Sequence, residues 1–158
     1  MDIDSLLAQQ RSDVVAEAYD ALQRSHPTHY EAAGEAFTLE RLADLFDLVL
    51  TALRNRELGP VGAYCEDVAE RRFEAGFGIS EVQTAFNTLE EAMWKRVVAG
   101  VPADGLAEAM GLLTTILGFG KDALARRYVS LASQRHVPTL DLSAMFSGTE
   151  PSPTVDEQ

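Results

Sequence analysis

The chain has 158 residues, of which 46% are hydrophobic and 24% are charged, as in ordinary globular proteins. This length predicts one domain that buries its own core without support from a metal or a disulfide. Thirteen Lys and Arg stand against 25 Asp and Glu, which gives a formal net charge of -12. Such a surface repels phosphate groups, so we expect no nucleic-acid partner.

The N-terminus and the cysteine content indicate a protein that is not secreted. The first residues, MDIDSLLAQQ, have neither the basic nor the apolar part of a secretion signal. The one cysteine, Cys65, has no internal disulfide partner. The most apolar stretch, 106–120, is interrupted by Glu108 and is too short to span a bilayer. We therefore expect a cytoplasmic protein that does not enter a membrane.

The first part of the chain predicts two main helices joined by a short connector. Apolar residues at helical spacing predict a helix over 5–24, capped by Asp4 and ended by Pro27. Residues 29–33 then form a single helical turn. A second helix begins with Thr38 as its cap and ends near Asn55.

Three further main helices follow. Gly59 and Pro60 begin a helix that ends at Gly76, and a capping box at Ser80 begins the next one. The last helix starts at Asp104 and runs until Pro138. No stretch alternates apolar and polar residues between turn signals, so we expect no strand. The prediction is a single all-α bundle of five main helices, with globin-like or four-helix packing.

Small residues follow one flank of the last predicted helix, at Ala107, Gly111, Thr114, Thr115 and Gly118. Each glycine inside a helix costs about 1 kcal/mol relative to alanine, and close helix packing can offset that cost. We expect a homodimer in which Ala107, Gly111 and Gly118 provide the close contact. The alternative is a slightly flexible helix with incidental glycines.

Composition changes after Pro138, which divides the chain into a helical domain over 1–137 and a tail over 138–158. Ser, Pro, Thr, Gly and acidic residues dominate the tail, so we expect most of it to be disordered. Its segment 140–146 is apolar, and we expect this segment to dock on a partner or on the bundle. The docking residues are Leu140, Leu142, Met145 and Phe146.

The histidine content limits the possible metal and haem sites. The chain has three histidines and no paired Glu-x-x-His unit of the kind that holds a di-iron centre. His26, His29 and Glu31 lie close together in the sequence, but a solvated turn explains them better than a zinc site. No histidine occurs between residues 30 and 135, so a globin-type proximal ligand is absent. The cofactor stays unknown, and haem remains possible only with an unusual axial pair drawn from His29, Tyr30 or Cys65.

Arg71, Arg72 and Glu81 flank a predicted turn at Gly76. We expect a structural ion pair between one of these arginines and Glu81, with ligand recognition as the alternative. Trp94 is predicted to anchor the core or an interface.

No residues point to catalysis, because the chain has no nucleophile elbow and no phosphate-binding glycine loop. We therefore expect no enzymatic activity. A ligand pocket between the aromatic faces of the helices is the alternative use of the same side chains. The candidate ligand-binding residues are His29, Tyr30, Phe46, Tyr64, Arg72, Phe77, Glu81, Phe86 and Trp94.

The run RFEAGFGISEVQTAF, from Arg72 to Phe86, is followed by Leu89 and Trp94. Together with His29-Tyr30-Glu31 upstream and Ala125-Arg126-Arg127-Tyr128 downstream, it resembles the N-terminal helical sensor domain of RsbRD-type proteins, the RsbT co-antagonists. The resemblance covers about residues 5–132.

This resemblance implies an all-helical input module of a stress-response pathway, which precedes an output unit such as a STAS domain, a histidine kinase or a DNA-binding regulator. It carries over no catalytic residue. The residues after Pro138 are too few for an output domain, so we expect the chain to act through a ligand or a regulatory protein partner. The alternative is a carrier of haem or another small molecule.

Overall fold

The computed structural model describes residues 2–140, with side chains described up to residue 135. This part of the chain is helical, contains no strand, and has no helix long and apolar enough to cross a membrane. The all-α prediction is thus confirmed. The helices of residues 2–140 are α1 (Ile3–Gln9), α2 (Arg11–Arg24), α3 (Thr28–Ala33), α4 (Glu35–Asn55), α5 (Gly59–Glu74), α6 (Ile79–Gly100) and α7 (Ala103–Leu140).

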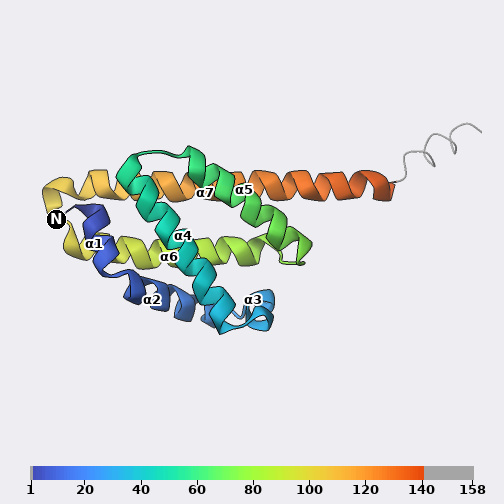
Figure 1. The fold of residues 1–158 in the computed structure, drawn as a ribbon, viewed down its shortest axis with the longest axis horizontal. Helices are drawn as coiled ribbons and strands as arrows, with labels where there is room; N and C mark the ends of the chain where they lie inside the picture. Colours follow the sequence, from blue (N-terminus) through green and yellow to red (C-terminus); the bar gives the residue numbers. More distant parts are fainter. Residues whose placement is uncertain (1, 141–158) are drawn as a thin grey trace, which may run out of the picture.

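The long helix α7 organises the bundle. It packs mainly against α5 and α6, while α2 packs against α6 and α4 on the other side. Figure 1 shows α6 and α7 running side by side, with α4 and α5 crossing them at a steep angle. The C-terminal part of α7 extends beyond the other helices in the same view.

The predicted count of five main helices is wrong at the N-terminal end. The expected helix over 5–24 is broken at Gln10, whose N–H donates to the Leu7 carbonyl at 3.0 Å. The break lets α1 turn onto the end of α6, where Leu6 lies over Gly100 so closely that a Cβ there would meet its methyl groups at 2.8 Å. Tertiary packing therefore determines this break, since Gln10 is no helix breaker in itself.

The predicted caps Asp4, Thr38, Ser80 and Asp104 are also wrong, because each helix begins earlier in the chain and contains the residue in question. Thr38 is fully buried inside α4, and its hydroxyl donates to the Gly34 carbonyl at 2.9 Å. At the other end of the chain, α7 continues past Pro138 to Leu140. None of the predicted docking residues has a described side chain: Leu140 is the last described residue of α7, and Leu142, Met145 and Phe146 lie outside the described residues.

The predicted stripe of the fourth main helix is confirmed in α6. Its apolar residues recur at helical spacing and all face the core. The buried members of the stripe are Val82, Phe86, Leu89, Met93 and Val97. Trp94 is 37% exposed and therefore does not anchor the core, while its predicted alternative role as an interface anchor stays a prediction.

Helices α5 and α7 meet in a contact that we call the glycine seam, formed by Val61, Gly62, Cys65, Phe119 and Gly120. A Cβ on Gly120 would lie 3.0 Å from the Cys65 sulfur, and one on Gly62 would lie 2.9 Å from the Phe119 ring. Real Cβ atoms rarely come so close to a neighbour, so both glycines allow the helix backbones to approach. The seam is apolar, and Gly120 lies where a side chain would meet Cys65 and Val61 of α5.

Candidate functional site

The short helix α3 is held against the turn between α5 and α6 by one carboxylate. Glu81 accepts from the backbone N–H of His29 at 2.8 Å, and the Nδ1 atom of His29 lies 2.6 Å from its second oxygen. The N–H of Gly78 donates to the same carboxylate at 3.3 Å, which satisfies a donor at the start of α6. Glu81 therefore joins two segments that are 52 residues apart in the chain.

Phe77, in the turn between α5 and α6, connects this carboxylate to the aromatic core. Its ring lies 4.8 Å from the ring of Tyr30 in an edge-to-face arrangement and 5.2 Å from the ring of His29. Its carbonyl accepts a hydrogen bond from the Tyr128 hydroxyl of α7 at 3.1 Å. Side chains from α3, α6, α7 and the turn between α5 and α6 therefore meet at this junction.

Arg72 is the unusual member of this group, because it is only 5% exposed and pairs with no carboxylate of the described residues. Its guanidinium lies over the ring of Phe37 at 5.0 Å and over the ring of Phe77 at 5.6 Å. These cation–π contacts partly replace the water that the cation loses on burial. We call His29, Tyr30, Arg72, Phe77 and Glu81 the Arg72 cluster.

The predicted ion pair between Arg71 or Arg72 and Glu81 is wrong. Arg71 instead pairs with Asp67 one turn earlier on α5, at 2.8 Å. Glu81 accepts from His29, which the sequence places far away. The carboxylate turns to α3 because two donors of His29 converge on it, and the aromatic rings then take up the Arg72 cation.

A cavity of about 20 Å³ lies beside the cluster. Its walls combine an apolar surface with two arginines and two tyrosines. The residues that line it are Tyr30, Arg41, Leu42, Leu45, Tyr64, Val68, Arg72, Ala85 and Phe86. The Nε atoms of Arg41 and Arg72 are both buried without a hydrogen-bond partner.

Burial and hydrogen bonds shift the pKa values of three tyrosines and of Glu81 at or near the cavity. Burial raises the pKa of Tyr30 and of Tyr64, and raises that of Tyr128 to about 12. Burial also acts to raise the pKa of Glu81, but the hydrogen bonds from His29 and Gly78 outweigh it and hold that pKa below its ordinary value. The cavity therefore presents phenol and guanidinium donors, which suit a ligand that accepts hydrogen bonds.

The structure brings together all the predicted ligand residues except Phe46 and Trp94. Phe46 is fully buried on α4 and does not line the cavity, while Trp94 is exposed on α6. Sequence reasoning missed Phe37 and Arg41, although their spacing of four residues on one helix is the signal for such a pair. The Arg41 guanidinium indeed lies 5.4 Å from the Phe37 ring centre.

The cavity is far smaller than the several hundred Å³ of a typical cofactor pocket. The haem-carrier alternative requires such a pocket between these aromatic faces, and this region of the bundle has no room for a macrocycle. Among the described residues no three His, Cys, Asp or Glu side chains gather as metal ligands. His26 lies 3.9 Å from Glu31, while His29 turns away to Glu81.

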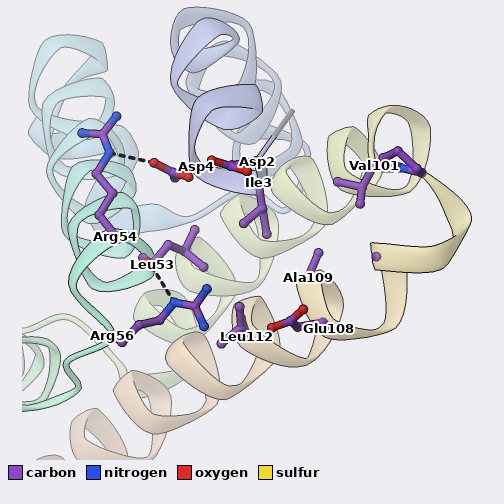
Figure 2. Close-up of a pocket in the computed structure, with 12 residues that line it drawn as sticks. Asp2, Ile3, Asp4, Leu53, Arg54, Arg56, Val101, Glu108, Ala109 and Leu112 are labelled. Carbon is purple, nitrogen blue, oxygen red and sulfur yellow. Dashed lines mark hydrogen bonds and ion pairs between the residues drawn. The ribbon is translucent and has the colours of Figure 1, made fainter.

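A larger cleft of about 570 Å³ lies at the other end of the bundle, between α1, the end of α4 and the start of α7. Figure 2 shows the Arg56 guanidinium and the Glu108 carboxylate turned toward the same space on either side of Leu112. Arg54 pairs with Asp4 at 3.1 Å, and Arg56 donates to the Leu53 carbonyl at 3.1 Å. The charged groups of this cleft are solvated or paired, unlike the buried arginine of the cluster.

The small-residue flank of α7 faces away from the bundle. Ala107, Gly111 and Gly118 are exposed, and a Cβ on either glycine would meet nothing within 4 Å. Beside the flank, Gly111 and Leu112 line a mostly apolar groove of about 410 Å³ that reaches to Leu58. The flank therefore serves no packing purpose within residues 2–140.

Comparison with known proteins gives one family. Residues 12–139 match the model of the RsbT co-antagonist protein rsbRD N-terminal domain. The matched stretch includes the Arg72 cluster, the glycine seam and nearly all of α7. No curated protein matches the chain.

Proposed function

The chain belongs to the family of RsbT co-antagonist protein rsbRD N-terminal domains, and from this premise we propose that it is a non-enzymatic sensor of a small ligand. In this proposal the ligand binds at the Arg72 cluster, and the bound state changes the contacts of the domain with a regulatory protein partner. The observation that carries the proposal is the buried Arg72 without a carboxylate partner, at the junction of α3, α4, α5, α6 and α7.

A ligand at this junction is well placed to act on distant surfaces. The cluster holds α3 to the α5–α6 turn through Glu81 and holds that turn to α7 through Tyr128. A ligand that favours one arrangement of these contacts shifts the whole bundle toward that arrangement. The shift requires different affinities for the two arrangements, because equal affinity changes no population.

The chemistry of the described side chains supports binding rather than catalysis. The Glu81 carboxylate is engaged by three donors and its lowered pKa makes it a weak base. Burial raises the pKa of the Cys65 thiol to about 12, so this thiol is a poor nucleophile at neutral pH. The tyrosines of the cavity stay protonated and act as donors.

The proposal assigns the exposed flank of α7 to a second copy of the chain, which gives a homodimer. Gly111 and Gly118 leave the helix backbone open to close approach by another helix, next to the apolar groove at Leu112. Sedimentation is expected to show a dimer that Gly111→Leu disrupts. Ser133→Leu introduces the same side chain at an exposed position of α7 beyond the flank and leaves the dimer intact. A monomer at high micromolar concentration contradicts this assignment.

The sensing role is tested in the native host with a transcriptional reporter of its stress response. Deletion of the gene that encodes the chain is expected to change the reporter response. Arg41→Gln is expected to change it when the variant is present at the same level as the wild-type protein. Arg54→Gln is the matched control, since Arg54 lies on the same helix and pairs with Asp4 away from the cluster. An unchanged response after deletion overturns the proposed function, and an unchanged response in Arg41→Gln alone moves the sensing site elsewhere.

A further inference from the structure

Arg41 and Arg72, which line the cavity beside the Arg72 cluster, each have a guanidinium Nε–H that no described residue satisfies. The Nε atoms of Arg41 and Arg72 are both buried, and both residues line the same cavity. Buried donors are nearly always paired in folded proteins, so two unpaired ones on one cavity indicate an acceptor that occupies it.

The side of the cavity that Arg72 lines carries a positive charge that no neighbouring carboxylate of the described residues neutralises. Glu81 is the acidic residue of the cluster, and it accepts hydrogen bonds from His29 and Gly78. The acids beside Arg41 are Glu40 and Asp44, which pair with its Nη2 atom at 2.6 Å and 3.1 Å and leave its Nε free. The groups described against the Arg72 charge are the rings of Phe37 and Phe77 and the Tyr30 phenol. An anion in the cavity supplies the missing countercharge.

The size of the cavity limits the class of anion. A volume of about 20 Å³ holds one water-sized group, since a single water requires about 10 to 15 Å³ by this measure. Chloride or one carboxylate group is of this order, whereas a phosphate ester or a sugar acid is too large. Arg41 and Tyr64 are partly exposed, so the cavity is reached from their side.

We propose that the cavity between Arg41 and Arg72 binds a small monovalent anion, either chloride or the carboxylate group of a small organic acid. The Nε–H groups of the two arginines donate to it, and the Tyr64 and Tyr30 phenols lie beside it as further donors. Phe86 and Leu45 form the apolar wall that keeps bulk water out. This inference names the ligand class of the proposed sensor and rests on that function only for its biological purpose.

The test is thermal unfolding of the full chain at fixed ionic strength, with sodium gluconate replaced stepwise by sodium chloride or by sodium formate. Gluconate is too large for the cavity and serves as the background anion. The unfolding midpoint is expected to rise with chloride or with formate and to saturate, because a ligand that binds only the folded state stabilises it. The salt with the lower half-saturation concentration identifies which of the two anion types the cavity prefers.

Neighbouring arginines of α5 provide the matched variants. Arg72→Met is expected to abolish the anion dependence, while Arg71→Met retains it, because Arg71 is exposed and pairs with Asp67. Arg41→Gln keeps the buried Arg72 cation. It is expected to raise the anion concentration at half-saturation about tenfold, because roughly one charged hydrogen bond is lost. This variant carries the test if Arg72→Met does not fold.

Equal unfolding midpoints in gluconate, chloride and formate overturn the anion site. So does an equal loss of anion dependence in Arg71→Met and Arg72→Met, since that indicates general surface binding. Saturable binding that depends on Arg41 and Arg72 supports the site even if the stress reporter does not respond to deletion. That combination overturns the sensing role alone, so the two proposals fail separately.

Discussion

The glycine seam and the Arg72 cluster are both buried junctions between helices, but they are built in opposite ways. At the seam, α5 and α7 approach until a Cβ on Gly120 would touch the Cys65 sulfur. At the cluster, a buried cation rests on aromatic rings beside a cavity, with two N–H groups unpaired. A close-packed apolar contact has a single favourable arrangement. A polar junction with unpaired donors can gain free energy by binding a ligand that accepts hydrogen bonds. The comparison assigns stability mainly to the seam and ligand response to the cluster.

Cys65 tests how tightly the seam is closed. Because burial raises the pKa of its thiol to about 12, we expect alkylation of the native chain at pH 8 to be at least about 100-fold slower than in the unfolded chain. Mass spectrometry of timed samples, with the chain in denaturant as reference, measures the two rates. Equal rates would show that the seam opens freely.

Phe86 lies between the two regions, since it lines the cavity and also approaches Gly120. Phe86→Ala is expected to lower the free energy of unfolding by about 3 to 5 kcal/mol, because it leaves a large void in the core. Val129→Ala, at a position that is 63% exposed, is the control and should change it by less than about 0.5 kcal/mol. Urea unfolding compares them, and a loss below about 1 kcal/mol for Phe86→Ala would contradict the packing described for α6.

Glu81 tests the polar side of the comparison. Glu81→Gln removes a charged acceptor from His29 and Gly78, and is expected to cost about 1 to 2 kcal/mol at pH 7. The folded-state pKa of Glu81 is lowered, so its contribution is present above the pKa of the unfolded chain and is lost as the pH falls through the folded-state pKa.

Unfolding curves between neutral and acidic pH measure this loss. The wild type should lose stability on acidification more steeply than Glu81→Gln, and the two should converge at low pH. Parallel curves would show that the carboxylate contributes nothing through its charge.

Two glycines of α7 give the smallest predicted effects, but with opposite signs. Gly120→Ala is expected to destabilise by about 1 kcal/mol, since overpacking against Cys65 and Val61 outweighs the gain in helix propensity. Gly111→Ala meets nothing within 4 Å and is expected to stabilise the chain by up to about 1 kcal/mol. Thermal unfolding of the two variants decides the point, and the same sign for both would place the seam elsewhere on the helix.

Apolar periodicity predicted most of the fold, because each helix must bury one face. The stripe of α6 from Val82 to Val97 illustrates this. The same reasoning failed where a contact between distant segments decides the local structure. The break at Gln10 depends on how Leu6 covers Gly100, which no local pattern encodes.

The sequence indicates which residues form the candidate site, but it does not indicate which of them contact each other. Aromatic residues, Arg72 and Glu81 could be selected by type and by their place near a turn. The partner of Glu81 could not, because His29 is 52 residues away and reaches it only through the packing of α3. The sequence pattern instead favours a local partner, Arg71 or Arg72. The unpaired Nε atoms of Arg41 and Arg72 are likewise visible only in three dimensions.

The central claim is that the chain binds its ligand at the Arg72 cluster rather than in the larger cleft of Figure 2. It is tested most directly by the backbone amide NMR spectrum of the full chain, as chloride or formate replaces gluconate at fixed ionic strength. The account predicts saturable shifts at His29, Phe77 and Gly78. Shifts confined to the cleft around Leu53 and Arg56, with the cluster unchanged, would contradict it.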